Sequence, residues 1–360
     1  MKRLLDPHSL RALARGCAVL GAGGGGDPYL GLLQALQATE DFGPVPLVDL
    51  DELPGDSLIM PCGGIGAPTV SIEKIENGDE GGRLREHLED LTGRRVAALM
   101  AAEIGGANAL LPITWAARMG LPVADADGMG RAFPEIPQVT MYLAGISPSP
   151  AVMTDERGNL VIFQTISGHW MERLERAAAV EFGGAASSTE FTLTAAEARG
   201  ATVRDSVSMA IRIGEAVSAA EGSPVDALIA ELGAFRLVTG KVLDAERRTT
   251  SGFARGSVVI EGLGADSGRL IRLELQNENL VALERGRVLA SVPDLITVLD
   301  SETADAIVTE RIAYGQRVTV IAFACDPVWR TEKGIAVAGP RTFGYEFDYL
   351  PVEELAGATA

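Results

Sequence analysis

The residues best suited to chemistry in this sequence are carboxylates that follow short apolar segments. Asp125 and Asp127 come directly after the apolar segment 121–124, and Arg131 and Glu135 follow them closely. Two carboxylates two residues apart in an extended backbone point to the same side. A nearby arginine can bind a substrate carboxylate or lower the pKa of one aspartate. Asp127 or Asp125 is therefore predicted to act as a general base toward water, with an internal salt-bridge network as the alternative.

Three other side chains are further candidates. Glu103 follows the apolar segment 96–101 and precedes two glycines, so it is a third candidate acid or base. Cys62 is a candidate nucleophile beside glycine N–H groups, although its pattern favours a small buried residue at a strand end. His169 could act as a base or a ligand, but the three histidines have no metal-ligand spacing.

A glycine-rich segment precedes these residues. Five of the six residues 21–26 are glycine, and such a run lets backbone N–H groups approach a ligand closely. Asp27 and Pro28 are typical of a helix start, and a glycine loop at a helix N-terminus can bind an anion or a polar group. The run also matches G-x-G-x-x-G, with Asp49 about twenty residues later, as in dinucleotide-binding folds. The residues before it indicate a helix rather than a strand, so a cradle for another ligand and a tight turn remain alternatives.

A second glycine-containing loop is predicted at residues 61–68, after the apolar segment 57–60. In parallel sheets ligands bind beyond the carboxyl ends of the strands, where these motifs are expected to meet. The predicted catalytic residues are Asp127, Asp125 and Glu103. The predicted substrate-binding residues are Gly23, Gly24, Gly25, Gly26, Asp27, Cys62, Gly63, Gly64, Asn108, Arg131 and His169.

The elements that must position these residues change in character along the chain. Helices alternate with short apolar strands in the first half, which predicts an α/β domain with a mainly parallel sheet over residues 1–165. A hairpin is predicted over 151–165, and one helix over 194–219, started by Thr194 and Glu197 as a capping box. Residues 166–360 are predicted to form a β-rich α+β domain, with helices followed by a sandwich-like or barrel-like sheet.

Composition limits the partners. The formal net charge is −18, which argues against binding to nucleic acid or to an anionic membrane. Three widely spaced cysteines predict no disulfide framework and a cytoplasmic location, and no apolar run is long enough to span a membrane. A small-molecule substrate and a homo-oligomer are expected. No cofactor is predicted, and a divalent metal ion held by carboxylates is an open alternative.

The motifs together resemble a known bacterial family. Segments 20–29, 102–108 and 125–135, with Phe343-Gly344-Tyr345 near the end, are similar in kind and order to the S-methyl-thiohydantoin desulfurase domain family, formerly a family of unknown function. The resemblance implies an α/β domain followed by a β-rich domain. It also implies an association with hydantoinase and oxoprolinase proteins, beside or fused to which such domains are found. It implies an activity on S-methylated thiohydantoins and supplies no set of catalytic residues.

The leading hypothesis is therefore a hydrolase of a five-membered cyclic amide-like ring such as an S-methyl-thiohydantoin or hydantoin. Water activated by Asp127 or Asp125 would attack the ring carbon that carries sulfur, and methanethiol would leave. Backbone N–H groups of 23–26 and 63–66 would bind the ring, and Arg131 would bind a substrate carboxylate. The alternatives are a nucleotide-binding protein that uses residues 21–26, and a non-catalytic partner subunit of a hydantoinase-like enzyme.

Overall fold

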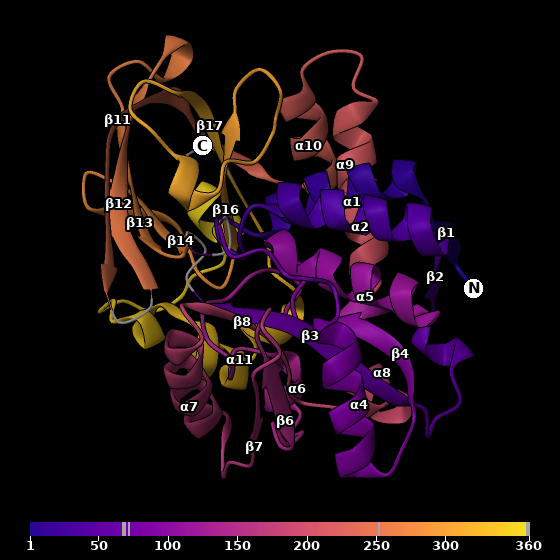
Figure 1. The fold of residues 1–360 in the computed structure, drawn as a ribbon. Coiled ribbons are helices and arrows are strands. Elements are labelled where there is room, and N and C mark those ends of the chain that lie inside the picture. Colours follow the sequence, from indigo (N-terminus) through magenta and orange to yellow (C-terminus); the bar gives the residue numbers. More distant parts are fainter. Residues whose placement is uncertain (67–69, 71–72, 251–252, 358–360) are drawn as a thin grey trace.

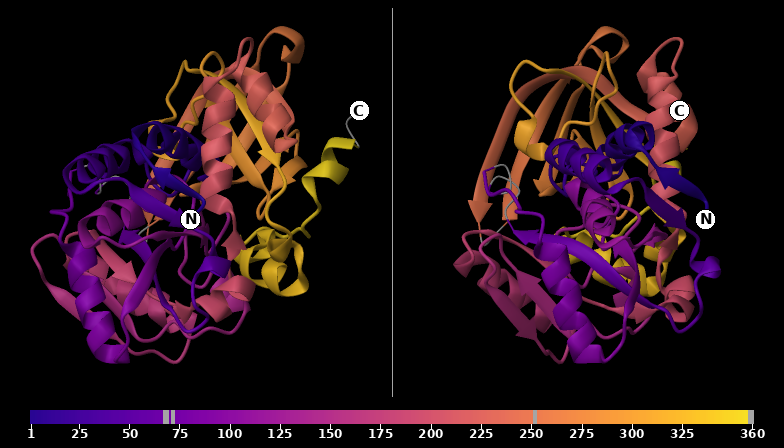
Figure 2. Two further views of the ribbon diagram at one scale, coloured as in Figure 1. Left: turned by 90° about the vertical axis from the view of Figure 1, so that its right-hand side faces the viewer. Right: turned by 45° about the vertical axis from the view of Figure 1, so that its right-hand side comes forward.

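The computed structural model describes residues 1–66, 70, 73–250 and 253–357. Two sheets dominate it, a mixed sheet built mostly from the first half and an antiparallel sheet from the second half (Figure 1). Figure 2 shows the antiparallel sheet (orange) above the mixed sheet (purple), with helices around both.

The mixed sheet has parallel strands at its centre. Its strands follow the order β1-β2-β5-β4-β3-β8-β6-β7, and the neighbours from β2 to β3 are parallel. The central strands are β2 (Val45–Val48), β5 (Val123–Asp127), β4 (Val96–Ala101) and β3 (Leu58–Gly66). The antiparallel strands are β1 (Arg3–Leu5), β8 (Ala185–Thr189), β6 (Ala151–Thr154), β7 (Leu160–Phe163), β9 (Leu193–Thr194) and β10 (Val203–Arg204).

Helices pack on this sheet or on one another, and the last of them packs on the antiparallel sheet described below. They are α1 (Pro7–Leu20), α2 (Pro28–Phe42), α4 (Glu80–Thr92), α5 (Leu111–Met119), α6 (Thr140–Leu143), α7 (Gly168–Glu181), α8 (Ala195–Ala201), α9 (Ser206–Ser218) and α10 (Pro224–Leu232). The predicted start of α2 is confirmed, because the side chain of Asp27 accepts a hydrogen bond from the N–H of Tyr29 and Pro28 takes the first helical position.

The second sheet is antiparallel throughout. Its order is β15-β14-β13-β12-β11-β17-β16. The strands are β11 (Phe235–Thr250), β12 (Phe253–Gly262), β13 (Leu270–Gln276), β14 (Glu278–Glu284), β15 (Arg287–Ser291), β16 (Leu295–Asp300) and β17 (Arg317–Phe323). After β17, α11 (Glu332–Ala338) returns to the mixed sheet, where Trp329 Nε1 donates to the carbonyl of Met129 at 2.7 Å, and α12 (Val352–Gly357) ends the described chain.

The predicted fold class is confirmed, since an α/β part with a parallel centre is followed by a β-rich part. The mixed sheet also takes in β8, β9 and β10, which follow residue 165. One apolar core joins the two halves, with Leu13 and Cys17 of α1 in the same buried cluster as Leu295 and Leu299 of β16. The two sheets are therefore held in a fixed relation by shared packing.

Two predicted elements differ from the structure. The predicted loop 61–68 continues strand β3 as far as Gly66, because Gly63 and Gly64 pair with Ser188 and Ser187 of β8; residues 67 and 68 lie outside the described part. The predicted helix 194–219 divides into α8 and α9, because Val203 instead pairs with the backbone of Asp127. The capping box of Thr194 and Glu197 is confirmed.

Among the described residues, no helix is both long and apolar enough to cross a membrane.

Candidate functional site

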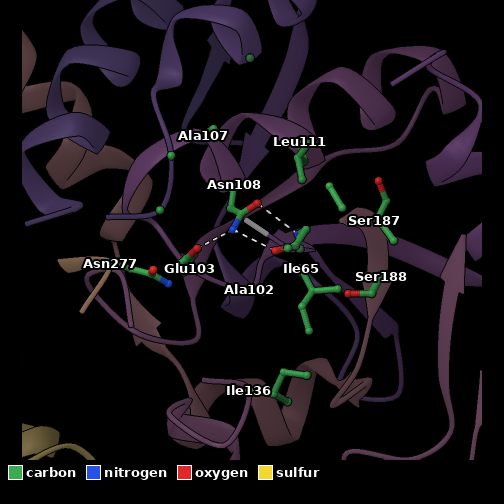
Figure 3. Close-up of a pocket in the computed structure, with 18 of the residues that line it drawn as sticks. Ile65, Ala102, Glu103, Ala107, Asn108, Leu111, Ile136, Ser187, Ser188 and Asn277 are labelled. Atoms are coloured by element: carbon green, nitrogen blue, oxygen red, sulfur yellow. Dashed lines mark hydrogen bonds between the residues drawn. The ribbon is translucent and has the colours of Figure 1, made fainter. Parts of the chain in front are cut away.

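A cavity of about 490 Å³ lies beside the carboxyl ends of β3 and β4, where the mixed sheet meets the antiparallel sheet (Figure 3). Its walls combine segments that are far apart in sequence. They include Gly25, Gly26 and Asp27 before α2, Gly63 and Gly64 of β3, Ala102 and Glu103 after β4, Asn108, Ser187 and Ser188 of β8, and Asn277 and Glu278 at the start of β14. This is the position that a sheet with a parallel centre favours for a ligand.

Glu103 and Asn108 form the polar floor of this cavity. The Nδ2 group of Asn108 donates to Oε1 of Glu103, and its Oδ1 accepts the N–H of Gly64 at 3.1 Å (Figure 3). The N–H of Phe133 donates to Oε2 of Glu103 at 3.4 Å. Asn108, in the 3-10 helix η2 (Gly106–Leu110), therefore ties Glu103 to strand β3 and fixes the direction of its carboxyl group.

Burial changes the protonation of the Glu103 carboxyl group at the cavity floor. Glu103 is 6% exposed, and desolvation raises its pKa to about 8, against the hydrogen bonds that favour the charged form. A carboxyl group with such a pKa carries a proton at neutral pH and can donate it. The same cause raises the pKa of Glu76 to about 7 and that of Glu278 well above its usual range.

The described lining carries more acidic than basic side chains. The acidic ones are Asp27, Glu76, Glu103, Glu135, Asp155, Glu156, Glu190 and Glu278. The basic ones are engaged with the protein: Lys74 pairs with Glu156 at 3.0 Å, and Arg311 pairs with Asp27 at 2.5 Å. Arg176 pairs with Glu172 and donates to the carbonyl of Pro134 at 3.2 Å. A ligand is therefore expected to contact neutral or anionic groups, because the basic side chains of the lining already interact with other parts of the protein.

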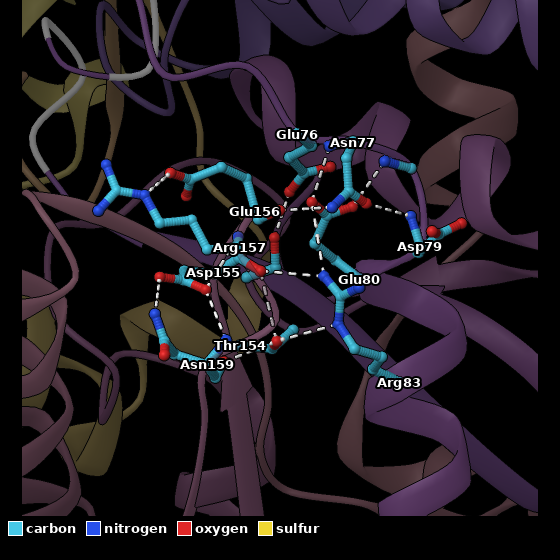
Figure 4. A network of polar contacts seen from close by, with 12 residues as sticks. Glu76, Asn77, Asp79, Glu80, Arg83, Thr154, Asp155, Glu156, Arg157 and Asn159 are labelled. Atoms are coloured by element: carbon cyan, nitrogen blue, oxygen red, sulfur yellow. Dashed lines mark hydrogen bonds and ion pairs between the residues drawn. The ribbon is translucent and has the colours of Figure 1, made fainter.

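A polar network holds one rim of the cavity (Figure 4). Both carboxylate oxygens of Glu80 accept backbone N–H groups, from Asn77 and Gly78, each at 2.8 Å. Arg83 of α4 donates to the carbonyl of Asp155 at 2.9 Å. The network ties the segment before α4 to the hairpin of β6 and β7, so the rim residues of the two segments keep a fixed spacing.

Asp127 and Asp125 do not line the cavity. Oδ2 of Asp127 accepts three buried N–H groups, from Ile104, Met129 and Gly130, at 2.8–2.9 Å, so this carboxylate joins the loops after β4 and β5. Asp125 accepts from Lys2 Nζ and from the N–H of Ser208, each at 2.9 Å. The geometry matches the salt-bridge alternative for Asp125 and a structural role for Asp127.

Three further predicted site residues also point elsewhere. Arg131 is fully buried and donates to the carbonyls of Pro293 at 2.6 Å and Ala132 at 2.8 Å, so it holds the antiparallel sheet to the mixed one. Cys62 is buried in β3, and burial raises the pKa of its thiol, which makes it a poor nucleophile. His169 is exposed on α7.

The glycine loop is mainly a packing device. Gly25 accepts the N–H of Ala107 at 2.8 Å, and Gly23, at φ +94°, accepts the N–H of Thr309 at 2.8 Å. A Cβ on Gly24 would lie 2.0 Å from Oε1 of Glu278. The loop thus lets η2 and β14 approach, and of its glycines only Gly25 and Gly26 line the cavity.

Of the predicted site residues, the structure brings seven together around the cavity: Gly25, Gly26, Asp27, Gly63, Gly64, Glu103 and Asn108. Sequence reasoning missed Glu76, Glu190 and Glu278. For Glu278 a signal existed, because four polar residues, 276–279, stand between two apolar strands. No group of three or more His, Cys, Asp or Glu side chains suited to a metal ion occurs among the residues that the structure describes.

Comparisons with known proteins identify relatives of the whole chain. A family model described as S-Me-THD-like, N-terminal domain, matches residues 8–165, and one described as S-Me-THD-like, C-terminal domain, matches residues 166–352. Among solved structures, the chain is similar to the crystal structure of a protein from Chromobacterium violaceum determined by a structural genomics consortium. The identity is 25% over 97% of this chain and 100% of that chain, with a TM-score of 0.80. No curated protein matches the chain.

Proposed function

The chain belongs to the S-Me-THD-like family, and we propose that it is a hydrolase that releases methanethiol from S-methyl-thiohydantoins or closely related five-membered rings. One observation carries the proposal: Glu103, whose burial raises its pKa to about 8, faces a cavity of about 490 Å³. A neutral carboxyl group of this kind is suited to protonate a ring nitrogen.

The proposed reaction begins with Glu103 in its protonated form. Glu103 donates its proton to the ring nitrogen that is doubly bonded to the carbon carrying the methylthio group, which makes that carbon more electrophilic. Water attacks this carbon and gives a proton to the carboxylate of Glu103, so that a tetrahedral intermediate forms. The carbon–sulfur bond then breaks as Glu103 gives its proton to the sulfur, which leaves as methanethiol. The carboxylate of Glu103 takes the proton of the hydroxyl group, so the carbon becomes the carbonyl of a hydantoin and Glu103 is protonated again.

The surrounding groups support this role for Glu103. Asn108 donates to the carboxyl oxygen Oε1, so the group keeps one orientation through both proton transfers. The apolar side chains Ile65, Leu111 and Ile136 line the same cavity and favour exclusion of bulk water around the ring (Figure 3). Asp127, one of the two bases that the sequence predicts, acts in this proposal only by holding the loop that carries Glu103.

The nucleotide-binding alternative has less support. The glycine loop follows helix α1 rather than a strand, and the cavity wall that it forms is acidic. Asp49, which would bind a ribose, instead caps a 3-10 helix and pairs with Lys2 at 3.1 Å and Arg204 at 2.7 Å.

The test is a direct assay of methanethiol release from an S-methyl-thiohydantoin, with the thiol detected colorimetrically and the hydantoin by mass. The wild type and Glu86→Gln, an exposed position on α4, should turn over at equal rates. Glu103→Gln should be slower by about 10²–10⁴-fold, the usual contribution of a general acid. Equal rates for Glu103→Gln and the wild type, or no thiol from the wild type across a series of ring substituents, would refute the proposal.

A further inference from the structure

We propose that Glu278 recognises the amide edge of the ring, with its neutral carboxyl group donating to the ring carbonyl and accepting the adjacent ring N–H. This inference rests on the proposed function for the class of ring. It assigns a specificity-determining role to a residue that comes from the antiparallel sheet rather than from the α/β part.

The position of Glu278 indicates a ligand. The side chain lines the cavity but is only 2% exposed, and its Oε2 atom is buried without a hydrogen-bond partner among the described residues. A buried polar atom left without a partner costs free energy, and a ligand that supplies the missing bond removes this cost. The orphaned oxygen therefore favours a ligand with a hydrogen-bonding group in this part of the cavity.

The carboxyl group of Glu278 fits at the cavity wall because the neighbouring residue of the glycine loop has no side chain. A Cβ on Gly24 would lie 2.0 Å from Oε1 of Glu278 and 2.5 Å from its Cδ. The carboxyl group therefore occupies the space that the side chain of any other residue at position 24 would need. The next residue, Asn279, is anchored beside it, because its Nδ2 donates to the carbonyl of Ala22 at 3.0 Å. The glycine loop and the start of β14 thus fit together and hold the carboxyl group at the cavity wall.

The charges around Glu278 favour its neutral form. Burial raises the pKa of Glu278 well above its usual range, and the neighbouring carboxyl of Glu103 acts in the same direction, as does Glu310. Arg131 opposes them, but its guanidinium donates to main-chain carbonyls rather than to Glu278. These effects favour the neutral carboxylic acid, which carries one donor and one acceptor side by side.

A cyclic amide presents the complementary pair. Its N–H and C=O groups are held cis by the ring, so one neutral carboxyl group can form two parallel hydrogen bonds with them. An S-methylated thiohydantoin keeps such an edge when the nitrogen between its carbonyl carbon and the carbon that carries sulfur is protonated. Glu278 on this edge and Glu103 on the reacting nitrogen would use two carboxyl groups, one from the start of β14 and one from the loop after β4.

The test measures binding of hydantoin and of 1,3-dimethylhydantoin, which lacks both N–H groups, by isothermal titration calorimetry at pH 7. The wild type should bind hydantoin about 10- to 100-fold more tightly than the dimethyl compound, as expected for two hydrogen bonds. Glu278→Gln keeps one donor and one acceptor and should keep this preference. Glu278→Leu should bind hydantoin 10- to 100-fold more weakly and lose the preference. Glu86→Gln is the matched surface control.

Three results would overturn the inference. In the first, Glu278→Gln loses as much binding as Glu278→Leu, which would indicate a charged carboxylate. In the second, the wild type binds the two compounds equally. In the third, the wild type does not bind hydantoin. If Glu278→Leu does not fold, the wild type and Glu278→Gln still decide between these outcomes. The proposed function fails separately, since a wild type that prefers hydantoin but releases no methanethiol would support the edge contact and refute the reaction.

Discussion

Replacing Glu103 by glutamine should remove a pH dependence from the stability of the protein. The pKa of Glu103 is about 8 in the folded protein and 4.5 by its usual value, so the folded chain holds a proton that the unfolded chain releases between these limits. The contribution to the free energy of unfolding is fully present below pH 4.5 and is lost as the pH rises through 8. At about 1.4 kcal/mol per pH unit, the loss between pH 5.5 and 8 is about 3 kcal/mol.

Glutamine has no proton to lose, so Glu103→Gln should be about 3 kcal/mol less pH-dependent over this interval than the wild type. The assay is urea denaturation at half-unit steps of pH, with the free energy of unfolding compared between the two proteins at each step. Buried carboxyl groups that do not interact with Glu103 contribute equally to both proteins and cancel in the difference. Glu86→Gln should follow the wild type at every pH. A constant difference between Glu103→Gln and the wild type from pH 5.5 to 8 would refute the reasoning.

Three other substitutions test the packing around the site. Gly24→Ala should weaken hydantoin binding at least 10-fold, measured by calorimetry, because its Cβ would displace the carboxyl of Glu278, whereas Gly82→Ala, with nothing within 4 Å, should leave binding unchanged. Asp127→Ala should lower the free energy of unfolding by about 3 kcal/mol or more, since three buried N–H groups lose their acceptor; a change below 1 kcal/mol in urea denaturation would contradict this. Arg131→Met should cost about 2–4 kcal/mol in the same assay, because carbonyls of Pro293 and Ala132 lose their donor, and an unchanged midpoint would be inconsistent with the structure.

Local chemistry made part of the site predictable. Asp27 and Pro28 mark the start of α2 by rules that depend on adjacent residues only. Glu103 follows an apolar strand, and the carboxyl ends of parallel strands meet at one edge, so its place at the cavity floor follows from the fold class.

Contacts distant in sequence made the rest unpredictable. Gly63 and Gly64 belong to a strand only because β8 pairs with them, and Gly24 is small because Glu278 fills the space beside it. Asp127 likewise ends a strand, but its carboxylate turns toward three backbone N–H groups of the loops after β4 and β5. Spacing in the sequence does not distinguish a carboxylate that satisfies the backbone from one that faces a ligand.

The most direct test of the proposed chemistry is the pH dependence of kcat/KM for methanethiol release from an S-methyl-thiohydantoin. With Glu103 as general acid, the wild-type value should fall as the pH rises through about 8, and Glu103→Gln should be slower by about 10²–10⁴-fold without this fall. A wild-type rate that rises with pH through 8 would contradict the account, as would the same fall in Glu103→Gln, because the titrating group would then be another residue.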